Sequence, residues 1–589
     1  MSVAMDRRSF LTRSAATAGG VAFSGTVVDA LVADSALATV GKDPGYRYGG
    51  KVVVGVGSEA PAVKTFSGSQ GHFDGAGYCV ALAVYDLLFT TGADGHTLIP
   101  GLALSATPDS TYKKWTIKLR PGVLFHNGDP FNADVVVKNY LACVADATNG
   151  LAIAPIYAGC TKVDNLTVLY TTKLPWTTFP NSLTGQLAFM AHPDVFDTVS
   201  GKAAGPYGSF GTPGGGNPIG TGPFKWKNWV LNGQNIWDRN PHYWGKDAAG
   251  RQLPYLDQVE FKVLVDDNSR LQALQAGTVD LMTTGNGGTI RTIQAGISGA
   301  TWRTDQADPK DPGANMLIVN TAGKNFLGQA GAVDPGTLAW NTSLRSHVSD
   351  PNIRKAMAMA INRTAFLNIV DGGTGVAVDG IYQPKSKYYP KGGPGYPAFN
   401  PTAGQALVTA YKKAHGISTN LKIVVDLIAQ NSGQVKAFSF LQPAFAAIGI
   451  TLVERWLVTS DLITTKVFKT YDLSAWSQFG GTDPANNFVW LSQGNFVNFA
   501  QNSDPIIQKA MLAALAAKPG SSAQISNWAL VDQRLAIDLP YLWLDSSVSI
   551  WAANSRVKNW AYAVGADGKT QMTNPGGGAI TCFQMYVSS

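Results

Sequence analysis

Charged residues are scarce in this chain of 589 residues, because Asp, Glu, Lys and Arg together make up 14% of it, against about 25% in an average soluble protein. Hydrophobic residues make up 45%, so the chain can bury a sizeable core, which excludes an intrinsically disordered protein. The net charge of +7 is scattered, with no run of five basic residues. This distribution argues against a nucleic-acid-binding surface, and we expect no nucleic-acid partner.

Cysteine is also rare, and four cysteines in a chain of this length cannot form a disulfide scaffold. They show no CxxC spacing and have no histidine nearby, which disfavours a metal site. The hydrolase motifs GxSxG and HExxH are missing, and so are the nucleotide-binding motifs GxGxxG and GxxxxGK[ST]. These absences favour a protein that is not an enzyme and that carries no cofactor or metal.

Residues 1–38 have the pattern of an export signal. Arg7-Arg8-Ser9-Phe10-Leu11 matches a twin-arginine consensus and precedes a weakly hydrophobic stretch from Ser14 to Val28. That stretch is shorter than the roughly 18 apolar residues that a membrane helix requires, so we do not expect it to be an anchor. Ala36-Leu37-Ala38 resembles a signal peptidase site. The sequence therefore predicts a mature chain that begins near Thr39 in the periplasm or the extracellular cell-envelope space.

Export to an oxidising compartment makes disulfide formation favourable. Cys143 ends an amphipathic stretch that begins at Asn132, and Cys160 comes shortly before a strand-like run from Leu166 to Thr171. The short loop between them can return the chain, so we predict a disulfide between Cys143 and Cys160.

Strand-like and helix-like patterns alternate along the chain. Lys51 to Val56 is rich in β-branched residues, and Tyr78 to Phe89 has apolar residues at helical spacing. Further on, a strand pattern (Leu421 to Leu427), a helix pattern (Ser432 to Ile448) and another strand pattern (Thr451 to Arg455) follow one another. This order is typical of a βαβ unit, so the sequence predicts a mixed α/β fold.

Five segments, taken in order, resemble the signatures of the family 5 extracellular solute-binding proteins of ABC importers, a family that includes oligopeptide, dipeptide and nickel binders. Each segment alone is modest evidence, but their common order is specific, and the resemblance covers nearly all of the mature chain. The segments are Trp115 to Asp134, Asn217 to Phe224, Asn240 to Trp244, Gln275 to Asp280 and Asp350 to Arg363.

The resemblance implies a two-lobed periplasmic-binding-protein-like α/β fold (type II, cluster C) with an extra subdomain in the amino-terminal lobe. The two chain crossings between the lobes are expected near Ile318 to Thr321 and near Tyr541 to Asp545. Closure of the lobes about these crossings would trap the solute. The expected parts are lobe I (39–80, 195–318 and 541–589), the extra subdomain (81–194) and lobe II (319–540).

The resemblance also places a ligand site in an interlobe cleft. Trp476 corresponds to the tryptophan of the family's ligand-binding loop, where peptide binders carry an aspartate three residues later and can carry a basic residue three residues earlier. Here those places hold Phe479 and Leu473, so both charged residues are missing. The resemblance predicts ligand contacts from Glu59, Ala60, Trp476, Gln478, Phe479, Gly480, Asp483 and Asn486.

The predicted function is that of an exported, monomeric component of an ABC import system, which captures a peptide or a similar small-molecule solute and delivers it to the permease subunits in the membrane. The missing charges and the aromatic loop leave a neutral oligosaccharide as an alternative ligand. Twin-arginine export often carries folded, cofactor-loaded cargo, so an exported enzyme or cofactor protein is a second alternative.

Overall fold

The computed structural model describes residues 46–59, 75–92, 97–146, 149–195, 218–230, 233–304, 313–429, 431–478, 483–546, 548–564, 570–572 and 579–588. All of them belong to one unit, Pro44–Ser589. The predicted export signal and three of the predicted site residues, Ala60, Phe479 and Gly480, lie outside the described residues. No helix within the described ranges is long and apolar enough to cross a membrane.

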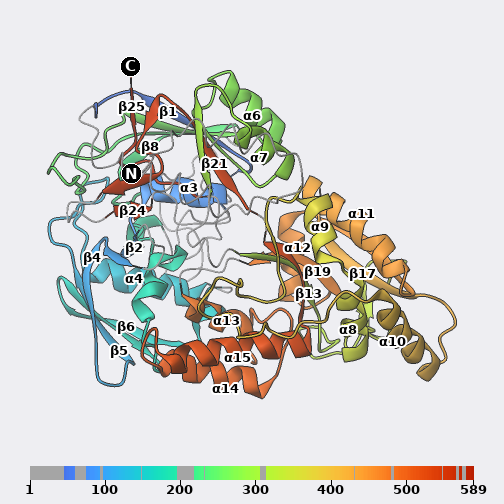
Figure 1. The fold of residues 1–589 in the computed structure, drawn as a ribbon. Coiled ribbons are helices and arrows are strands. Elements are labelled where there is room, and N and C mark those ends of the chain that lie inside the picture. The colour runs from blue at the N-terminus through green and yellow to red at the C-terminus, as the bar shows by residue number, and fades with distance from the viewer. Residues whose placement is uncertain are drawn as a thin grey trace, which may run out of the picture. The chain divides into compact units, whose positions relative to one another are not determined.

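Seven strands of the described chain form the sheet of lobe I (Figure 1). Its central strand β1 is parallel to both of its neighbours and exposes only its first residue, Lys51, which explains the apolar run Lys51–Val56 and confirms the strand predicted there. In sheet order the strands are β12 (Ala300–Thr304), β21 (Ile550–Asn554), β11 (Leu281–Thr284), β1 (Lys51–Val56), β10 (Gln258–Val263), β9 (Gln234–Arg239) and β8 (Phe224–Val230). The helices of this lobe are α3 (Gly75–Val84), α6 (Asp267–Gln275) and α7 (Gly287–Gln294).

The segment that resembles the family's Gly-Thr-Gly-Pro turn packs against the end of α3. A Cβ atom on Gly220 would lie 1.8 Å from the Val84 carbonyl oxygen, and one on Gly222 would lie 2.7 Å from it. The Gly222 N–H donates a hydrogen bond to that same oxygen at 3.0 Å. Only glycine permits this approach, and the contact ends α3 at Val84 rather than at the Phe89 expected from the apolar spacing.

The extra subdomain contains a sheet of four described strands, β4 (Ala103–Pro108), β5 (Lys114–Leu119), β7 (Thr167–Thr172) and β6 (Tyr157–Asp164). Helix α4 (Ala133–Ala145) contacts β6 and β7. The side chain of Asn132 caps α4 by accepting hydrogen bonds from the backbone N–H groups of Asp134 and Val135. The shorter helices here are α5 (Asn149–Ile153), η1 (Phe179–Thr184), η2 (Gln186–Ala188) and η3 (Pro193–Val195).

Cys143 on α4 and Cys160 on β6 are buried in this subdomain, and both are free thiols. The disulfide predicted between Cys143 and Cys160 is therefore not formed in the structure. Burial raises the pKa of each of these two thiols to about 12. Burial and then the two neighbouring thiols raise the pKa of Tyr140. The pairing itself stays a prediction for the exported protein.

Six described strands form the sheet of lobe II, and helices α8 to α11 surround it (Figure 1). The predicted βαβ unit is confirmed, because β17 and β18 are parallel and α11 connects them. In sheet order the strands are β16 (Val376–Ala377), β20 (Tyr541–Ser546), β13 (Ala314–Val319), β19 (Leu473–Gln478), β17 (Leu421–Ile428) and β18 (Ile450–Leu457). The helices are α8 (Pro351–Ala360), α9 (Arg363–Val370), α10 (Pro401–Ala414), α11 (Ser432–Ala446), α12 (Thr459–Val467), η5 (Pro484–Asn487), α13 (Phe488–Leu491), α14 (Pro505–Ala516) and α15 (Ser522–Asp538).

The crossings between the lobes differ from the expected ones. Strands β13 and β20 pair with each other in the lobe II sheet, and β13 also pairs with β19. The chain therefore leaves the lobe I sheet after Thr304 and returns to it at Ile550. The predicted boundary at 318/319 cuts through β13, and the one at 540/541 lies just before β20, so both differ by several residues from the places where the chain changes sheets. The reason is that strand pairing, rather than the local sequence pattern, decides which sheet a buried strand joins.

Four pairs of short strands complete the described elements. They are β2 (Phe89–Thr91) with β3 (Leu98–Pro100), β14 (Ala332–Val333) with β15 (Trp340–Asn341), β22 (Val557–Lys558) with β25 (Tyr586–Val587), and β23 (Tyr562–Val564) with β24 (Thr570–Met572).

Candidate functional site

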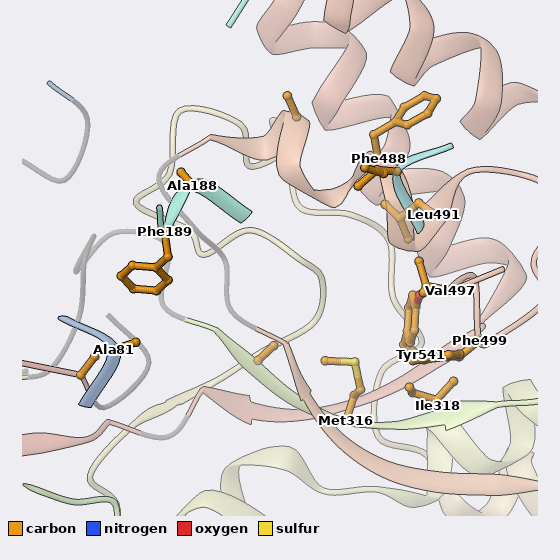
Figure 2. Packing of buried hydrophobic residues seen from close by; sticks show 14 of the residues in the cluster. Ala81, Ala188, Phe189, Met316, Ile318, Phe488, Leu491, Val497, Phe499 and Tyr541 are labelled. Carbon is orange, nitrogen blue, oxygen red and sulfur yellow. The ribbon is translucent and has the colours of Figure 1, made fainter. Parts of the chain in front are cut away.

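Two indole side chains and a methionine line up across the central strands of the lobe II sheet. Met316 on β13 is in register with Trp476 on β19 and with Trp543 on β20. Residues directly opposite each other on neighbouring strands have side chains on the same face, so these three form a row. Figure 2 shows Met316 with its neighbours Ile318 and Tyr541 on these strands, and Phe499, Val497 and Leu491 near them.

A small pocket opens on this face of the sheet. Its volume is about 20 Å³, which is room for water rather than for a solute. None of its lining residues carries a charge, and Gln478, one of the predicted ligand contacts, is among them. The lining residues, which together with Trp476 and Ser474 we call the lobe II wall, are Ala314, Met316, Ile381, Gln478, Asn487, Leu491, Tyr541 and Trp543.

The lobe II wall holds polar groups that are buried without a hydrogen-bond partner. Trp543 Nε1, Asn487 Nδ2 and Ser474 Oγ have no partner within the described part of the chain. Asn487 Oδ1 accepts a hydrogen bond from Gln478 Nε2 at 3.2 Å, so only the donor end of its amide is unused. A buried polar group without a partner costs about 1–3 kcal/mol. A solute with carbonyl or hydroxyl oxygens would remove this cost by accepting from these donors.

A larger cavity surrounds Asp86, whose carboxylate is already paired, while the hydroxyl of Thr581 in its lining has no partner among the described residues. The Asp86 carboxylate accepts hydrogen bonds from Thr221 Oγ1 (2.9 Å), Tyr243 Oη (3.0 Å) and Trp244 Nε1 (2.7 Å). The volume of this cavity is about 450 Å³. Because Asp86 joins two of the segments that resemble the family signatures, this network stabilises the scaffold, and the unpaired donors of the lobe II wall make the wall the better candidate.

Trp476 is half-buried, and aromatic and cationic groups surround its ring. The Phe499 ring stands nearly perpendicular to it, with 6.0 Å between the two centroids. On its face lies the ammonium group of Lys466, with Nζ 4.6 Å from the ring centroid. Sequence reasoning missed Lys466, because a lysine in the last turn of a helix is an ordinary feature and nothing in the local pattern indicates that it is buried.

Asp483 is placed differently from the expected ligand contact. Its Oδ1 accepts a hydrogen bond from the Ala485 N–H at 3.0 Å, which caps η5, and its Oδ2 accepts one from Asn181 Nδ2 of η1 at 3.2 Å. The side chain is buried, and this burial raises the pKa of the carboxyl. Both oxygens are therefore engaged, Oδ1 within lobe II and Oδ2 with the extra subdomain.

The other two described candidates lie away from the pocket lining. Asn486 is half-buried on η5, where its backbone N–H donates to the Asp483 carbonyl oxygen at 3.1 Å. Glu59 is half-buried, shortly after β1 of the lobe I sheet. Neither lines the pocket that Gln478 and Asn487 share. The described residues contain no group of three or more His, Cys, Asp or Glu side chains that could hold a metal ion.

The chain is similar to known binding proteins in sequence. The model of the bacterial extracellular solute-binding proteins, family 5, matches residues 97–499. The glutathione-binding protein GsiB of Pectobacterium atrosepticum is 32% identical over 228 residues, which are 38% of this chain and 40% of that protein. The nickel-binding periplasmic protein of Escherichia coli is 28% identical over 311 residues, or 52% of this chain and 51% of that protein. The chain thus matches about half or less of the length of these two relatives.

Solved structures give the same fold. The periplasmic binding protein DppA of Helicobacter pylori, which is associated with an ABC transporter and was solved with the peptide STSA, superposes with a TM-score of 0.73 at 18% identity. That superposition covers 92% of this chain and 99% of DppA. It confirms the two-lobed, type II periplasmic-binding-protein fold. Because the family model also matches well over half of the chain, the chain belongs to family 5 of the bacterial extracellular solute-binding proteins.

Proposed function

We propose that the mature chain is the exported, non-enzymatic binding component of an ABC importer, and that it captures a peptide or a similar small solute against the lobe II wall and delivers it to the permease. The observation that carries this proposal is the set of unpaired donors on that wall, Trp543 Nε1, Asn487 Nδ2 and Ser474 Oγ. Peptide backbones present carbonyl oxygens at regular intervals, and these oxygens are the acceptors that such donors require.

The chemistry of the wall supports a peptide over the alternatives. The residues that line its pocket are apolar and aromatic apart from two amide side chains, Gln478 and Asn487, as in sites that bury most of a small ligand and orient it with a few polar groups. DppA is described as binding a peptide, and GsiB as binding glutathione, which is itself a tripeptide. An oligosaccharide or an enzyme substrate has no comparable support among these relatives.

The test is to identify the solute directly. Chain 39–589 is purified from its own host and denatured, and the released molecules are identified by mass spectrometry. We expect peptides, and we expect the same peptides to bind the emptied protein in calorimetric titrations with dissociation constants of about 1 μM or lower. Release of an oligosaccharide alone, or of a bound chromophore, would contradict the proposal.

Trp456→Ala is the matched control for variants of the wall. Trp456 lies on β18 of the same sheet and contacts Phe438 of α11, with 6.3 Å between the ring centroids. Its neighbour Arg455 is in register with Asp426, and Asp426 is in register with Ser474 of the wall. Since successive side chains alternate between faces, Trp456 points away from the face of the wall. Its removal should leave solute binding unchanged.

A further inference from the structure

Two lysines of lobe II are buried beside the aromatic side chains of the proposed site. Lys466 on α12 is 0% exposed and Lys469 is 5% exposed. Lys466 Nζ lies 4.6 Å from the centroid of the Trp476 ring, and Lys469 Nζ lies 4.9 Å from that of the Phe499 ring. Because Trp476 and Phe499 are themselves in contact, both ammonium groups lie next to one aromatic pair.

Among the described residues, these two lysines donate hydrogen bonds only to backbone carbonyl groups. Lys466 Nζ donates to the Leu462 carbonyl oxygen of its own helix at 3.4 Å, near the limit of a hydrogen bond. Lys469 Nζ donates to the carbonyl oxygens of Phe496 and Asn498, both at 2.9 Å. Neither lysine forms an ion pair with a carboxylate in the described part of the chain.

The charged groups that act on Lys466 are Asp426 on β17 and Arg455 on β18. Arg455 holds Asp426 with two hydrogen bonds, from Nε to Oδ1 at 2.7 Å and from Nη2 to Oδ2 at 2.8 Å. Thr465 Oγ1 also donates to Oδ2 at 2.8 Å. Arg455 thus offsets much of the charge of Asp426, so Lys466 is only partly compensated and has no carboxylate in direct contact among the described residues.

We infer that Lys466, supported by Lys469, sets the charge preference of the site, so that the solute is acidic and places a carboxylate group near Trp476. This inference rests on the proposed function and narrows its substrate class. A buried cation that is only partly compensated is costly, and a carboxylate beside the same indole reduces this cost without touching the ammonium group. The cation also occupies the ring face that would otherwise attract a cationic ligand.

The residue that supplies the positive charge differs from the one that the family resemblance suggests. In the family a basic residue three positions before the tryptophan can hold a carboxylate, and Leu473 stands there in this chain. Lys466 approaches the same tryptophan from α12. The attraction acts across the ring, at about twice the distance of a direct ion pair, so it should amount to roughly a tenfold difference in affinity.

The dependence of solute binding on pH provides a second test of this charge preference. Burial lowers the pKa of both lysines to about 7, so each loses its charge as the pH rises through neutrality. A carboxylate on the solute favours the charged lysine, and binding of an acidic solute should therefore take up protons. The preference for an acidic solute should grow from pH 8 to pH 6.

Matched peptides test the inference on the unmodified protein. Ala-Glu-Ala, Ala-Gln-Ala and Ala-Lys-Ala differ in charge at one position and are titrated calorimetrically into the emptied mature chain. We expect the glutamate peptide to bind about tenfold more tightly than the glutamine peptide, and the lysine peptide to bind most weakly. Equal affinities would overturn the charge preference and leave the proposed function intact, whereas failure of all three peptides to bind would overturn both.

Variants locate the source of the preference. Lys466→Met should reduce the preference for the glutamate peptide to less than about threefold and abolish its change with pH. Lys466→Arg should retain the preference, and it provides the test if the methionine variant does not fold. Lys436→Met, on the exposed surface of α11, is the control and should bind all three peptides as the parent does. An undiminished preference in folded Lys466→Met would refute the role of Lys466.

Discussion

Replacement of Asp545 by asparagine should stabilise the protein at neutral pH. Asp545 lies on β20 and is 0% exposed. Its Oδ1 accepts a hydrogen bond from Asn315 Nδ2 at 3.1 Å, while its Oδ2 has no donor, and neither has Oδ2 of Asp371. Burial and then the hydrogen bond and charge of Asp371 raise the pKa of Asp545 from 3.8 to about 9. At neutral pH Asp545 therefore retains a proton.

The sign and the size of the effect follow from proton linkage. Between about pH 4 and pH 9 the folded state holds a proton on Asp545 that the unfolded chain releases, so the free energy of unfolding falls as the pH rises. At pH 7 the carboxyl is about three pH units above its unfolded pKa, and keeping it protonated costs about 4 kcal/mol. Asparagine is neutral at every pH. It can accept from Asn315 and donate to Asp371, so it avoids most of this cost.

Urea unfolding of the mature chain, followed by tryptophan fluorescence between pH 4 and pH 8, measures this difference. The free energy of unfolding of Asp545→Asn should exceed that of the parent by roughly 2–4 kcal/mol at pH 7 and by almost nothing at pH 4. Asp461→Asn, at an exposed position on α12, is the control and should change the stability by less than about 0.5 kcal/mol. If Asp545→Asn is less stable than the parent at pH 7, or if its effect is the same at both pH values, Asp545 does not retain a proton in the folded protein at neutral pH.

Three further predictions concern binding, export and redox state. Trp476→Ala should weaken solute binding by one to two decades, since a stacked aromatic group contributes about 1–3 kcal/mol; unchanged affinity in titration calorimetry, with a melting temperature several degrees lower, would make the residue part of the core instead. Replacement of both Arg7 and Arg8 by lysine should retain the protein in the cytoplasm, because the export receptor distinguishes the guanidinium pair from other cations; cell fractionation that finds normal export would refute this. Cys143 and Cys160 should be linked in protein isolated after export, and non-reducing peptide mapping that finds both thiols free would remove the prediction.

The sequence alone determined the local structure and the family. The β-branched run Lys51 to Val56 predicted a strand because a strand buried on both faces needs apolar residues throughout. The alternation after Leu421 predicted the βαβ unit of lobe II, which the structure contains. The segments that resemble the family signatures could be recognised because close packing, such as that of Gly220 and Gly222 against Val84, restricts the residues allowed at each position.

The tertiary structure alone decided how distant segments meet. Strand pairing across more than 200 residues places β13 and β20 in one sheet, and it moves both chain crossings away from the expected positions. The same long-range packing engages Asp483 with Asn181 and brings Lys466 over Trp476. Each of these residues belongs to an ordinary local pattern, in which an aspartate precedes a proline or a lysine ends a helix. Their burial, and with it the charge of the proposed site, depends on neighbours that no short stretch of sequence contains.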